Sequence, residues 1–531
     1  MNRALGSLAL SVAALTLAAR VVGFGRSLVF SKTVGDTCLG DVYNAANSLP
    51  NVLFEIVAGG VLAGVVIPVV ARHVGAGRRS ETGLTVSALL TWTVLVLTPA
   101  GLAAWVGARW YAQAFAKADC ANSADTLAAL LAMFVPQVWL YGLAVVSAGV
   151  LQAHHRFGAA AAAPLLSSGV VIAASLAFAG LAGPADNRDL LATTRTALAV
   201  LGWGTTAGVL ALALGTVVPL ARLGLRLRPR LSFAAGDRSV IARIAAAGLA
   251  GLVLQQVSVL VISWAAQQSP DPGALTRFTW ANAIYLLPYA VLSAPLLQLI
   301  FPRLAAAAEQ GDDEVAEVLA EQAPLVVALA WLGASLLAAT SVPVARVFVL
   351  GPGSGRTEAL SWPISAFALA VVGFSVLGLA SRTLLAQHRA RWSGLATTSG
   401  WGAVVIAVLV VRLLVPPSWL VAGLAGAVSV GMLVGAVVGW TLVRRSLGPT
   451  RPVSLTRPML AGLGSAVPAV VLTGALGGLL AGSGIVAATF GAIGSVIICT
   501  AIFFALLRLL HPPLGRQIVA LLRRTVPVDR S

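Results

Sequence analysis

Apolar blocks of about 20 residues recur along this sequence from end to end, and each is long enough to cross about 30 Å of hydrocarbon. The chain of 531 residues is 58% hydrophobic and only 10% charged, whereas soluble domains carry roughly 25% charged residues. No stretch between the blocks is long enough for a sizeable second domain. The sequence therefore predicts an all-α polytopic membrane protein and excludes a water-soluble fold.

About fourteen transmembrane helices are predicted. They cover residues 7–30, 42–71, 84–107, 126–151, 159–182, 195–221, 240–266, 275–301, 322–350, 361–387, 393–414, 418–443, 458–481 and 485–508. Arginine gathers at the ends of the even-numbered spans, as in "ARHVGAGRRS", "HHRFG" and "ARLGLRLRPRLSFAAGDR", which places both termini in the cytoplasm. Because the net charge of +17 is dispersed among such short loops, we expect no nucleic-acid partner.

Two segments of the chain recur at an offset of about 234 residues, which indicates an internal repeat. The matched residues are Pro68 with Pro302, Ala71 with Ala305, Ser147 with Ser381, Leu151 with Leu385, and His154 with His388. We therefore expect two six-helix lobes related by a pseudo-two-fold axis along the membrane normal, with a substrate site between them. The N-lobe would cover 1–230 and the C-lobe 231–448, followed by two extra C-terminal helices in 449–510 and a basic cytoplasmic tail in 511–531.

Two arginines interrupt the first predicted span. Arg20 lies near its middle and Arg26 six residues further on, where a charge costs about 2.5–3.5 kcal/mol on insertion scales. We interpret them as a functional site facing a cavity. The second span carries a polar stripe with spacings of three and four, which must face protein or water; it consists of Asp41, Asn44, Ser48, Asn51 and Glu55. Glu55 is expected either to pair with the arginines or to form a purely structural ion pair.

Polar groups in the seventh and eighth spans are candidates for the second-lobe side of the cavity, or else for ordinary contacts between helices. They are Gln255, Gln256, Trp280, Asn282 and Tyr285. Cys38 and Cys120 both fall on outer loops and are either disulfide-bonded or free, whereas Cys499 is expected in the core. The histidines lack the company of other metal ligands, so we expect no metal and no cofactor.

The stretches "ARVVGFGR", "GDVYNAANSLPNVLFEIVAGGVLAGVVIPVVAR", "LQAHHRFGAAAAAPLL" and "LPYAVLSAPLLQLIFPRLA" resemble the MurJ (MviN) family of lipid II flippases, of an actinobacterial type. The resemblance covers essentially the whole chain. It implies a fold of the multidrug/oligosaccharidyl-lipid/polysaccharide exporter superfamily, with the two extra helices supplying a groove for a polyprenyl tail. Arg20 and Arg26 match the family's cavity arginines, and Asp41 matches its acidic residue on the second helix. Ser48, Phe54 and Ala283 stand where relatives often carry basic residues.

The implied function is transport of lipid II, the undecaprenyl-pyrophosphate-linked disaccharide pentapeptide, from the inner to the outer leaflet of the bacterial cell membrane for peptidoglycan synthesis. Arg20, Arg26, Asn44, Ser48 and Asn51 would contact the head group, and Asp41 and Glu55 would act as gating or charge partners. Membrane lipids and other cell-wall synthesis proteins are further expected partners. The alternatives are a cation-coupled multidrug or polysaccharide-lipid exporter and a membrane glycosyltransferase that uses Asp36 and Asp41; we favour a transporter rather than an enzyme.

Overall fold

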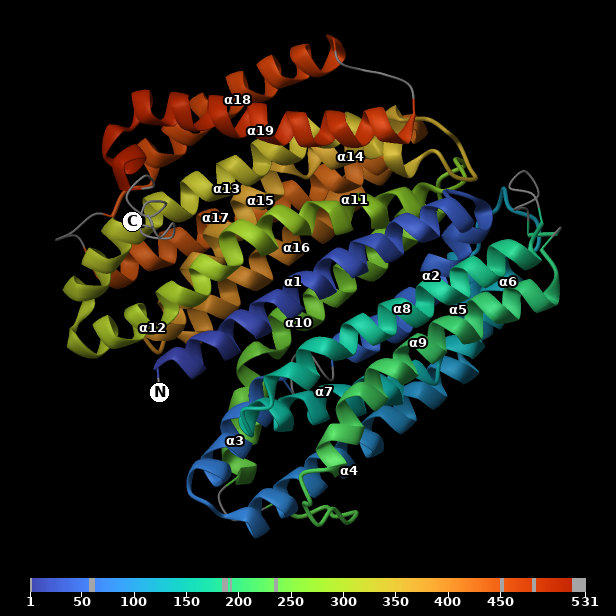
Figure 1. The fold of residues 1–531 in the computed structure, drawn as a ribbon, viewed down its shortest axis with the longest axis horizontal. Coiled ribbons are helices and arrows are strands. Elements are labelled where there is room, and N and C mark those ends of the chain that lie inside the picture. Colours follow the sequence, from blue (N-terminus) through green and yellow to red (C-terminus); the bar gives the residue numbers. More distant parts are fainter. Residues whose placement is uncertain are drawn as a thin grey trace. The chain divides into compact units, whose positions relative to one another are not determined.

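The computed structural model describes residues 2–56, 63–183, 190–191, 193–233, 237–448, 453–479 and 484–517, and these are the described residues below. They form almost entirely helices (Figure 1). The helices of the first half are α1 Asn2–Thr33, α2 Cys38–Phe54, α3 Ala63–Gly75, α4 Arg79–Val106, α5 Ala108–Phe115, α6 Ser123–Phe134, α7 Gln137–Ala153, α8 Phe157–Leu181, α9 Arg195–Ala221 and α10 Asp237–Gln267. The described residues contain no β-strand, and one isolated β-bridge pairs Asp36 with Gly353. The predicted all-α class is confirmed.

The second half continues with helices of the same kind. They are α11 Ala274–Pro288, the π-helix η3 Tyr289–Ser293, α12 Ala294–Gln310, α13 Asp312–Phe348, α14 Glu358–Ala366, α15 Ala368–Ala386, α16 Ala390–Leu414, the 3-10 helix η4 Pro417–Trp419, α17 Leu420–Leu447, α18 Thr456–Leu479 and α19 Ile485–Leu510. Twelve segments of the described chain are long and apolar enough to cross a membrane, and they coincide with the third to fourteenth predicted spans. The first two predicted spans correspond to α1 and to α2 with α3, and residues 57–62 between α2 and α3 lie outside the described residues.

The chain divides by contacts into two compact units. The first comprises residues 1–276 with 351–355, and the second comprises 277–350 with 356–531. In the first unit α8 packs against both α1 and α9, while α7 packs against α4 and α9. In the second unit α13 is the central helix, with 78% of its most apolar window buried, and α15, α18 and α19 pack against it. Contacts thus group α10 with the first unit, while the lobe boundary near residue 230 rests on sequence relatedness and stays a prediction.

Two of the divided spans, residues 126–151 and 361–387, each consist of two helices with a break near a proline. A neighbouring helix supplies a hydrogen bond at each of these two breaks. Thr206 on α9 donates its hydroxyl to the carbonyl of Met133 in α6, at 2.7 Å. Ser429 on α17 donates to the carbonyl of Ala366 at the end of α14, at 2.6 Å. Since lipid offers no hydrogen-bond donor, a helix break inside a membrane requires such a partner. Met133 and Ala366 are 233 positions apart.

The turns α7–α8 and α15–α16 share one conformation. His155 and His388 adopt the left-handed region, with φ of 58° and 59°. The following residues, Arg156 and Arg389, each donate to the carbonyl five positions back, both at 2.8 Å, which is the Schellman pattern of a helix end. His155 therefore corresponds to His388, also 233 positions apart. The predicted match of His154 with His388 is wrong by one residue, because adjacent histidines gave the sequence comparison two registers.

Candidate functional site

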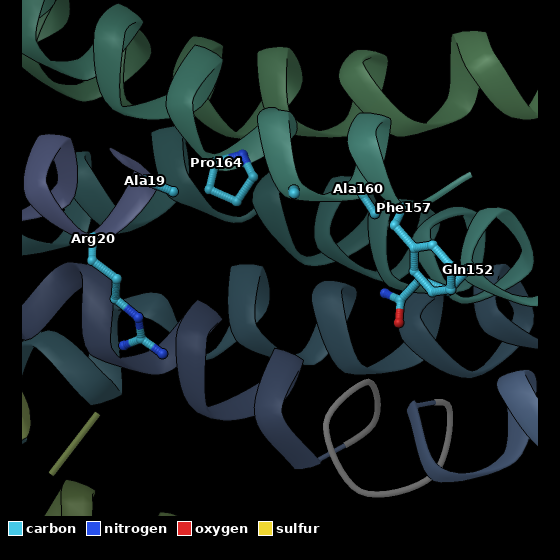
Figure 2. Close-up of a pocket in the computed structure, with 7 residues that line it drawn as sticks. Ala19, Arg20, Gln152, Phe157, Ala160 and Pro164 are labelled. Carbon is cyan, nitrogen blue, oxygen red and sulfur yellow. The ribbon is translucent and has the colours of Figure 1, made fainter. Parts of the chain in front are cut away.

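A cavity of about 480 Å³ lies beside Arg20 in the first unit (Figure 2). The remaining lining residues come from α1, the end of α7 and the start of α8: Ala19, Gln152, Phe157, Ala160, Ala161 and Pro164. The hollow exists because α8 begins with the sequence "FGAAAAAP", whose small side chains leave space next to α1. Arg20 stands at one end of the lining and Gln152, beside Phe157, at the other. An exposed guanidinium within a largely apolar lining suits an anionic group.

Arg26 is also exposed, two turns further along α1. Tyr43 in α2 packs against Phe30 in α1, with ring centroids 4.8 Å apart. Tyr141 packs against Phe54 with ring centroids 4.5 Å apart. Aromatic contacts thus connect α1 to α2 and α2 to α7. Within the described residues Glu55 forms no ion pair with Arg20 or Arg26, so the predicted direct pairing is absent from this structure.

Two residues of the polar stripe of α2 that were predicted to contact the head group form hydrogen bonds within the protein. The Asn44 amide donates to the Gly40 carbonyl at 2.8 Å and to the Thr276 hydroxyl at 3.1 Å. Ser48 donates to the Asn44 carbonyl within its own helix, at 2.8 Å. These two donors are engaged within the protein, whereas Asn51 is partly exposed.

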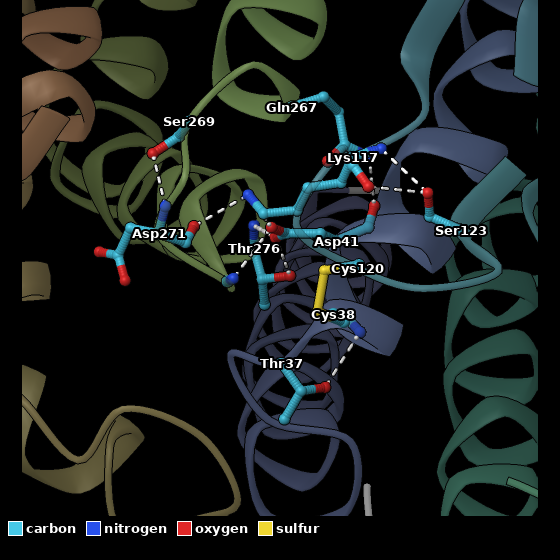
Figure 3. Close-up of polar contacts among 12 residues, drawn as sticks. Thr37, Cys38, Asp41, Lys117, Cys120, Ser123, Gln267, Ser269, Asp271 and Thr276 are labelled. Carbon is cyan, nitrogen blue, oxygen red and sulfur yellow. Dashed lines mark hydrogen bonds and ion pairs between the residues drawn. A yellow bond between two sulfur atoms is a disulfide. The ribbon is translucent and has the colours of Figure 1, made fainter. Parts of the chain in front are cut away.

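Asp41 lies at the centre of a buried network at the start of α2 (Figure 3). Its carboxylate accepts hydrogen bonds from the backbone N–H groups of Gly273 and Thr276, both at 2.9 Å, and from the Thr276 hydroxyl at 3.0 Å. The Lys117 ammonium lies 3.1 Å from the same carboxylate, and both side chains are fully buried. The charge partner of Asp41 is therefore Lys117 rather than an arginine of α1, because the lysine follows α5 and reaches back to α2.

A disulfide joins Cys38 and Cys120 next to this network, with Cα atoms 5.9 Å apart. It links the first residue of α2 to the loop before α6. Tyr111 in α5 adds a second link, because its hydroxyl donates to the Ala45 carbonyl at 2.8 Å. Burial raises the pKa of the Tyr111 phenol well above its ordinary value, so the group stays protonated as a donor. Cys499 is buried, as predicted.

Asp36 and Asp41, the acid pair considered for a glycosyltransferase, are both buried and engaged. Asp36 accepts hydrogen bonds from the Ser354 backbone N–H at 3.1 Å and from its hydroxyl at 2.5 Å. With Asp41 held by its own network, neither carboxylate is presented as an acid or base to a substrate. In the part of the chain that is described, no group of three metal-binding side chains is placed to hold an ion.

The second-lobe candidates separate into core residues and residues of α10. Trp280 is buried against Phe348, with ring centroids 5.4 Å apart, and Tyr285 stacks on Phe367 at 4.8 Å. Both therefore pack in an aromatic core, which fits the second of their two predicted roles, contact between helices. Aromatic residues in a span fit either role by type alone. Asn282 is half-buried on α11, and Gln255 and Gln256 lie on α10, which groups with the first unit.

The sequence reasoning missed Tyr43, Tyr141, Gln152 and Lys117. Lys117 offered a signal, since it is one of two lysines in the chain. Tyr141 and Gln152 offered little, because tyrosine and glutamine in or beside a span are typical of the membrane interface and of ordinary helix contacts.

The fold is similar to those of solved transporter structures. A solved structure of the lipid II flippase MurJ in an inward closed conformation matches with a TM-score of 0.71 at 16% identity, covering 93% of this chain and 98% of that chain. An inward-facing multidrug resistance MATE family transporter of the MOP superfamily matches with a TM-score of 0.65 at 14% identity, covering 83% of this chain and 98% of that chain. The predicted exporter-type fold is confirmed.

The model of the family "Lipid II flippase MurJ" matches residues 30–501, so this chain belongs to that family of multi-pass membrane proteins. The "Probable lipid II flippase MurJ" of Rhizobium meliloti is 29% identical over 352 residues, 64% of this chain and 62% of that protein. The lipid II flippase MurJ of Burkholderia cenocepacia is 24% identical over 394 residues, 71% of each chain. The alignments with the Rhizobium meliloti and Rhizobium tropici relatives span 62% and 55% of those proteins.

Proposed function

We propose that this protein is a lipid II flippase that moves the undecaprenyl-pyrophosphate-linked precursor from the inner to the outer leaflet of the bacterial cell membrane by alternating access. The observation that carries the proposal is Arg20, exposed on a largely apolar cavity beside α8. Both chain termini would lie in the cytoplasm, as the distribution of arginine among the loops favours. Membership of the MurJ family supports the choice of cargo.

The chemistry of the cargo fits these residues. A pyrophosphate diester has two anionic groups, and a guanidinium binds such oxygens through two parallel hydrogen bonds. Arg20 and Arg26 would each hold one group, and Asn51 would donate a further hydrogen bond. The reduced dielectric of an apolar cavity strengthens this attraction. The bound anion thereby offsets the cost of keeping two charges within the bilayer.

The membrane potential gives the movement a direction. With the inside negative, outward movement of negative charge is favoured by about 2.3 kcal/mol per charge per 100 mV. The phosphates move outward with the head group while the arginines stay on α1. Opening and closing of the lobes about the site would release the anion on the outer side.

The test is growth of cells depleted of their own flippase and supplied with variants of this protein. Loss of a hydrogen bond to a charged group costs about 1.5–3 kcal/mol, roughly 10–150-fold in affinity. We therefore expect Arg20→Ala or Arg26→Ala to abolish growth at unchanged protein levels, and Arg20→Lys to restore it partly. Arg109→Ala, at an exposed position on α5, is the matched control and should support growth. Full growth of the Arg20→Ala, Arg26→Ala double variant would refute the assignment.

A drug or other exporter of the same superfamily is the alternative that the MATE-like fold keeps open. Such a protein, when coupled to cations, needs carboxylates in its cavity, and Glu55 is an exposed carboxylate within a predicted span of the first unit. Binding of a lipid-linked pyrophosphate to the purified protein, compared with binding of a cationic drug, separates the two. Preferential binding of the drug, lost in Glu55→Gln, would favour the alternative.

A further inference from the structure

The segment after α9 has an alternating pattern that the proposed transport site does not use. It reads "LGLRLRPRL" over residues 223–231, and we name these residues the basic strap. Leu223, Leu225 and Leu227 pack against the buried cluster that includes Val66 and Val86. Because side chains alternate in an extended chain, Arg226, Arg228 and Arg230 face the other way, and all three are exposed.

The backbone of the strap is fixed along α4 by a series of hydrogen bonds. Arg79 donates to the Leu223 carbonyl at 2.8 Å, and the backbone N–H groups of Arg228 and Arg230 donate to the hydroxyls of Ser87 and Thr91 at 3.1 and 3.0 Å. The Trp92 indole donates to the Leu231 carbonyl at 3.0 Å. The Arg226 backbone lies opposite Gly83, and Gly83, Ser87 and Thr91 are spaced by four on α4, so they share one face of that helix.

Because these bonds fix the backbone, Arg226, Arg228 and Arg230 form an ordered row along α4. Neighbouring arginines of an extended chain lie about 6.6 Å apart. In the described part of the protein none of the three forms an ion pair with a carboxylate, and Arg230 donates from its Nε to the Ser232 hydroxyl at 2.6 Å. The row therefore presents guanidinium groups with free donors to whatever lies beside α4.

The row lies at the level expected for lipid phosphates. Ser87 and Thr91 are about 12 Å and 18 Å along α4 from its start at Arg79, at 1.5 Å per residue. The exposed large apolar side chains of α4 begin at Trp92 and continue with Val94, Leu95 and Val96. The strap, which ends beside Trp92, therefore lies at the inner edge of this apolar surface. Trp92 and Leu231 are exposed next to it. A tryptophan beside basic residues is typical of a membrane interface.

We propose that the basic strap is a binding site for phosphodiester headgroups of anionic phospholipids in the inner leaflet. Each guanidinium can bind phosphate oxygens through two hydrogen bonds. The apolar side chains of Trp92 and Leu231 lie beside the acyl chains. The site is separate from the Arg20 cavity and does not depend on which cargo the protein carries.

The experiment is native mass spectrometry of the purified full-length protein titrated with phosphatidylglycerol, with phosphatidylcholine as the neutral lipid. An arginine near an anionic surface contributes about a fivefold gain in binding, so the Arg226→Gln, Arg228→Gln, Arg230→Gln variant should bind phosphatidylglycerol about a hundredfold more weakly. The matched control is Arg109→Gln, Arg195→Gln, Arg412→Gln, which removes three exposed charges at predicted outer helix ends, away from the inner leaflet. It should stay within about threefold of the parent protein.

A second variant tests geometry with every charge retained. Ser87→Ala, Thr91→Ala removes the two hydroxyls that fix the strap, and we expect at least a fivefold loss of phosphatidylglycerol binding. If the triple arginine variant fails to fold, the Ser87→Ala, Thr91→Ala variant still tests whether the strap binds the lipid. Equal losses in the strap and control triples, binding of phosphatidylcholine as tight as phosphatidylglycerol, or an unchanged Ser87→Ala, Thr91→Ala variant would each overturn the proposal. Displacement of the lipid by millimolar inorganic phosphate would instead assign the row to a free anion.

Discussion

Asp41 and Lys117 form a fully buried ion pair, and the Asp41 carboxylate also accepts three hydrogen bonds. Breaking a buried ion pair by removing one partner costs about 3–5 kcal/mol, because the other charge stays buried alone. We expect Lys117→Met to lower the free energy of unfolding by about that amount, and Asp41→Asn, Lys117→Met to recover part of the loss. Thermal unfolding in detergent measures both. A single Lys117→Met variant as stable as the parent would show that the pair contributes nothing to the fold.

The sequence predicts functional residues best where a charged side chain within the bilayer carries a large free-energy cost. Arg20 was identified because a charge in the middle of a span is unfavourable unless it faces a cavity or a partner, and Arg20 lines a cavity. The partner of Asp41 was not predictable, since Lys117 lies 76 positions away and no local spacing connects the two. Tyr141 was equally hidden. Its contact with Phe54 depends on how α7 packs against α2, which side-chain type alone does not determine.

Among the elements, α16 and α17 approach each other through glycines. A Cβ on Gly431 would meet the Gly400 carbonyl at 2.7 Å and the Val404 backbone nitrogen at 2.9 Å, and backbone atoms cannot move aside cheaply. We expect Gly431→Ala to destabilise the protein by about 1–3 kcal/mol or more. Gly426→Ala, on the same helix with no atom within 4 Å of the added Cβ, should be neutral or stabilising by up to about 1 kcal/mol. Equal melting temperatures for the two variants would contradict this packing.

The elements themselves were largely predictable, because apolar length is a strong signal in membranes. The third to fourteenth spans are all present among the described residues. The breaks inside spans were not predicted, since proline is tolerated in membrane helices and its effect depends on a neighbour. The hydroxyls of Thr206 and Ser429, which satisfy Met133 and Ala366, come from other helices.

For the whole molecule, the arginine distribution predicts which loops face each side of the membrane. We expect Asp119→Cys, exposed in the loop before α6, to react with a membrane-impermeant maleimide on intact cells. Glu309→Cys, exposed at the end of α12, should react only after permeabilisation. Labelling of the Glu309→Cys variant on intact cells would reverse the proposed orientation.

At the same scale, the sequence indicated a duplicated chain but placed its register one residue off in the second alignment. The correspondence became clear from conformation: two histidines in left-handed turns and two broken spans, each pair 233 positions apart. The grouping of α10 with the first unit was not predictable, because it depends on contacts to α2, α3 and α5 that hydropathy does not encode.

In the proposed orientation, the bond between Cys38 and Cys120 also links biogenesis to the environment outside the cytoplasm. The two cysteines are 82 positions apart, and α2 to α5 lie between them. During synthesis the Cys38 thiol stays unpaired until these helices have been inserted and Cys120 has reached the outer side of the membrane. Closure of the ring therefore marks completed insertion of the early chain, and a host without an extracytoplasmic thiol oxidant would produce the protein with this ring open.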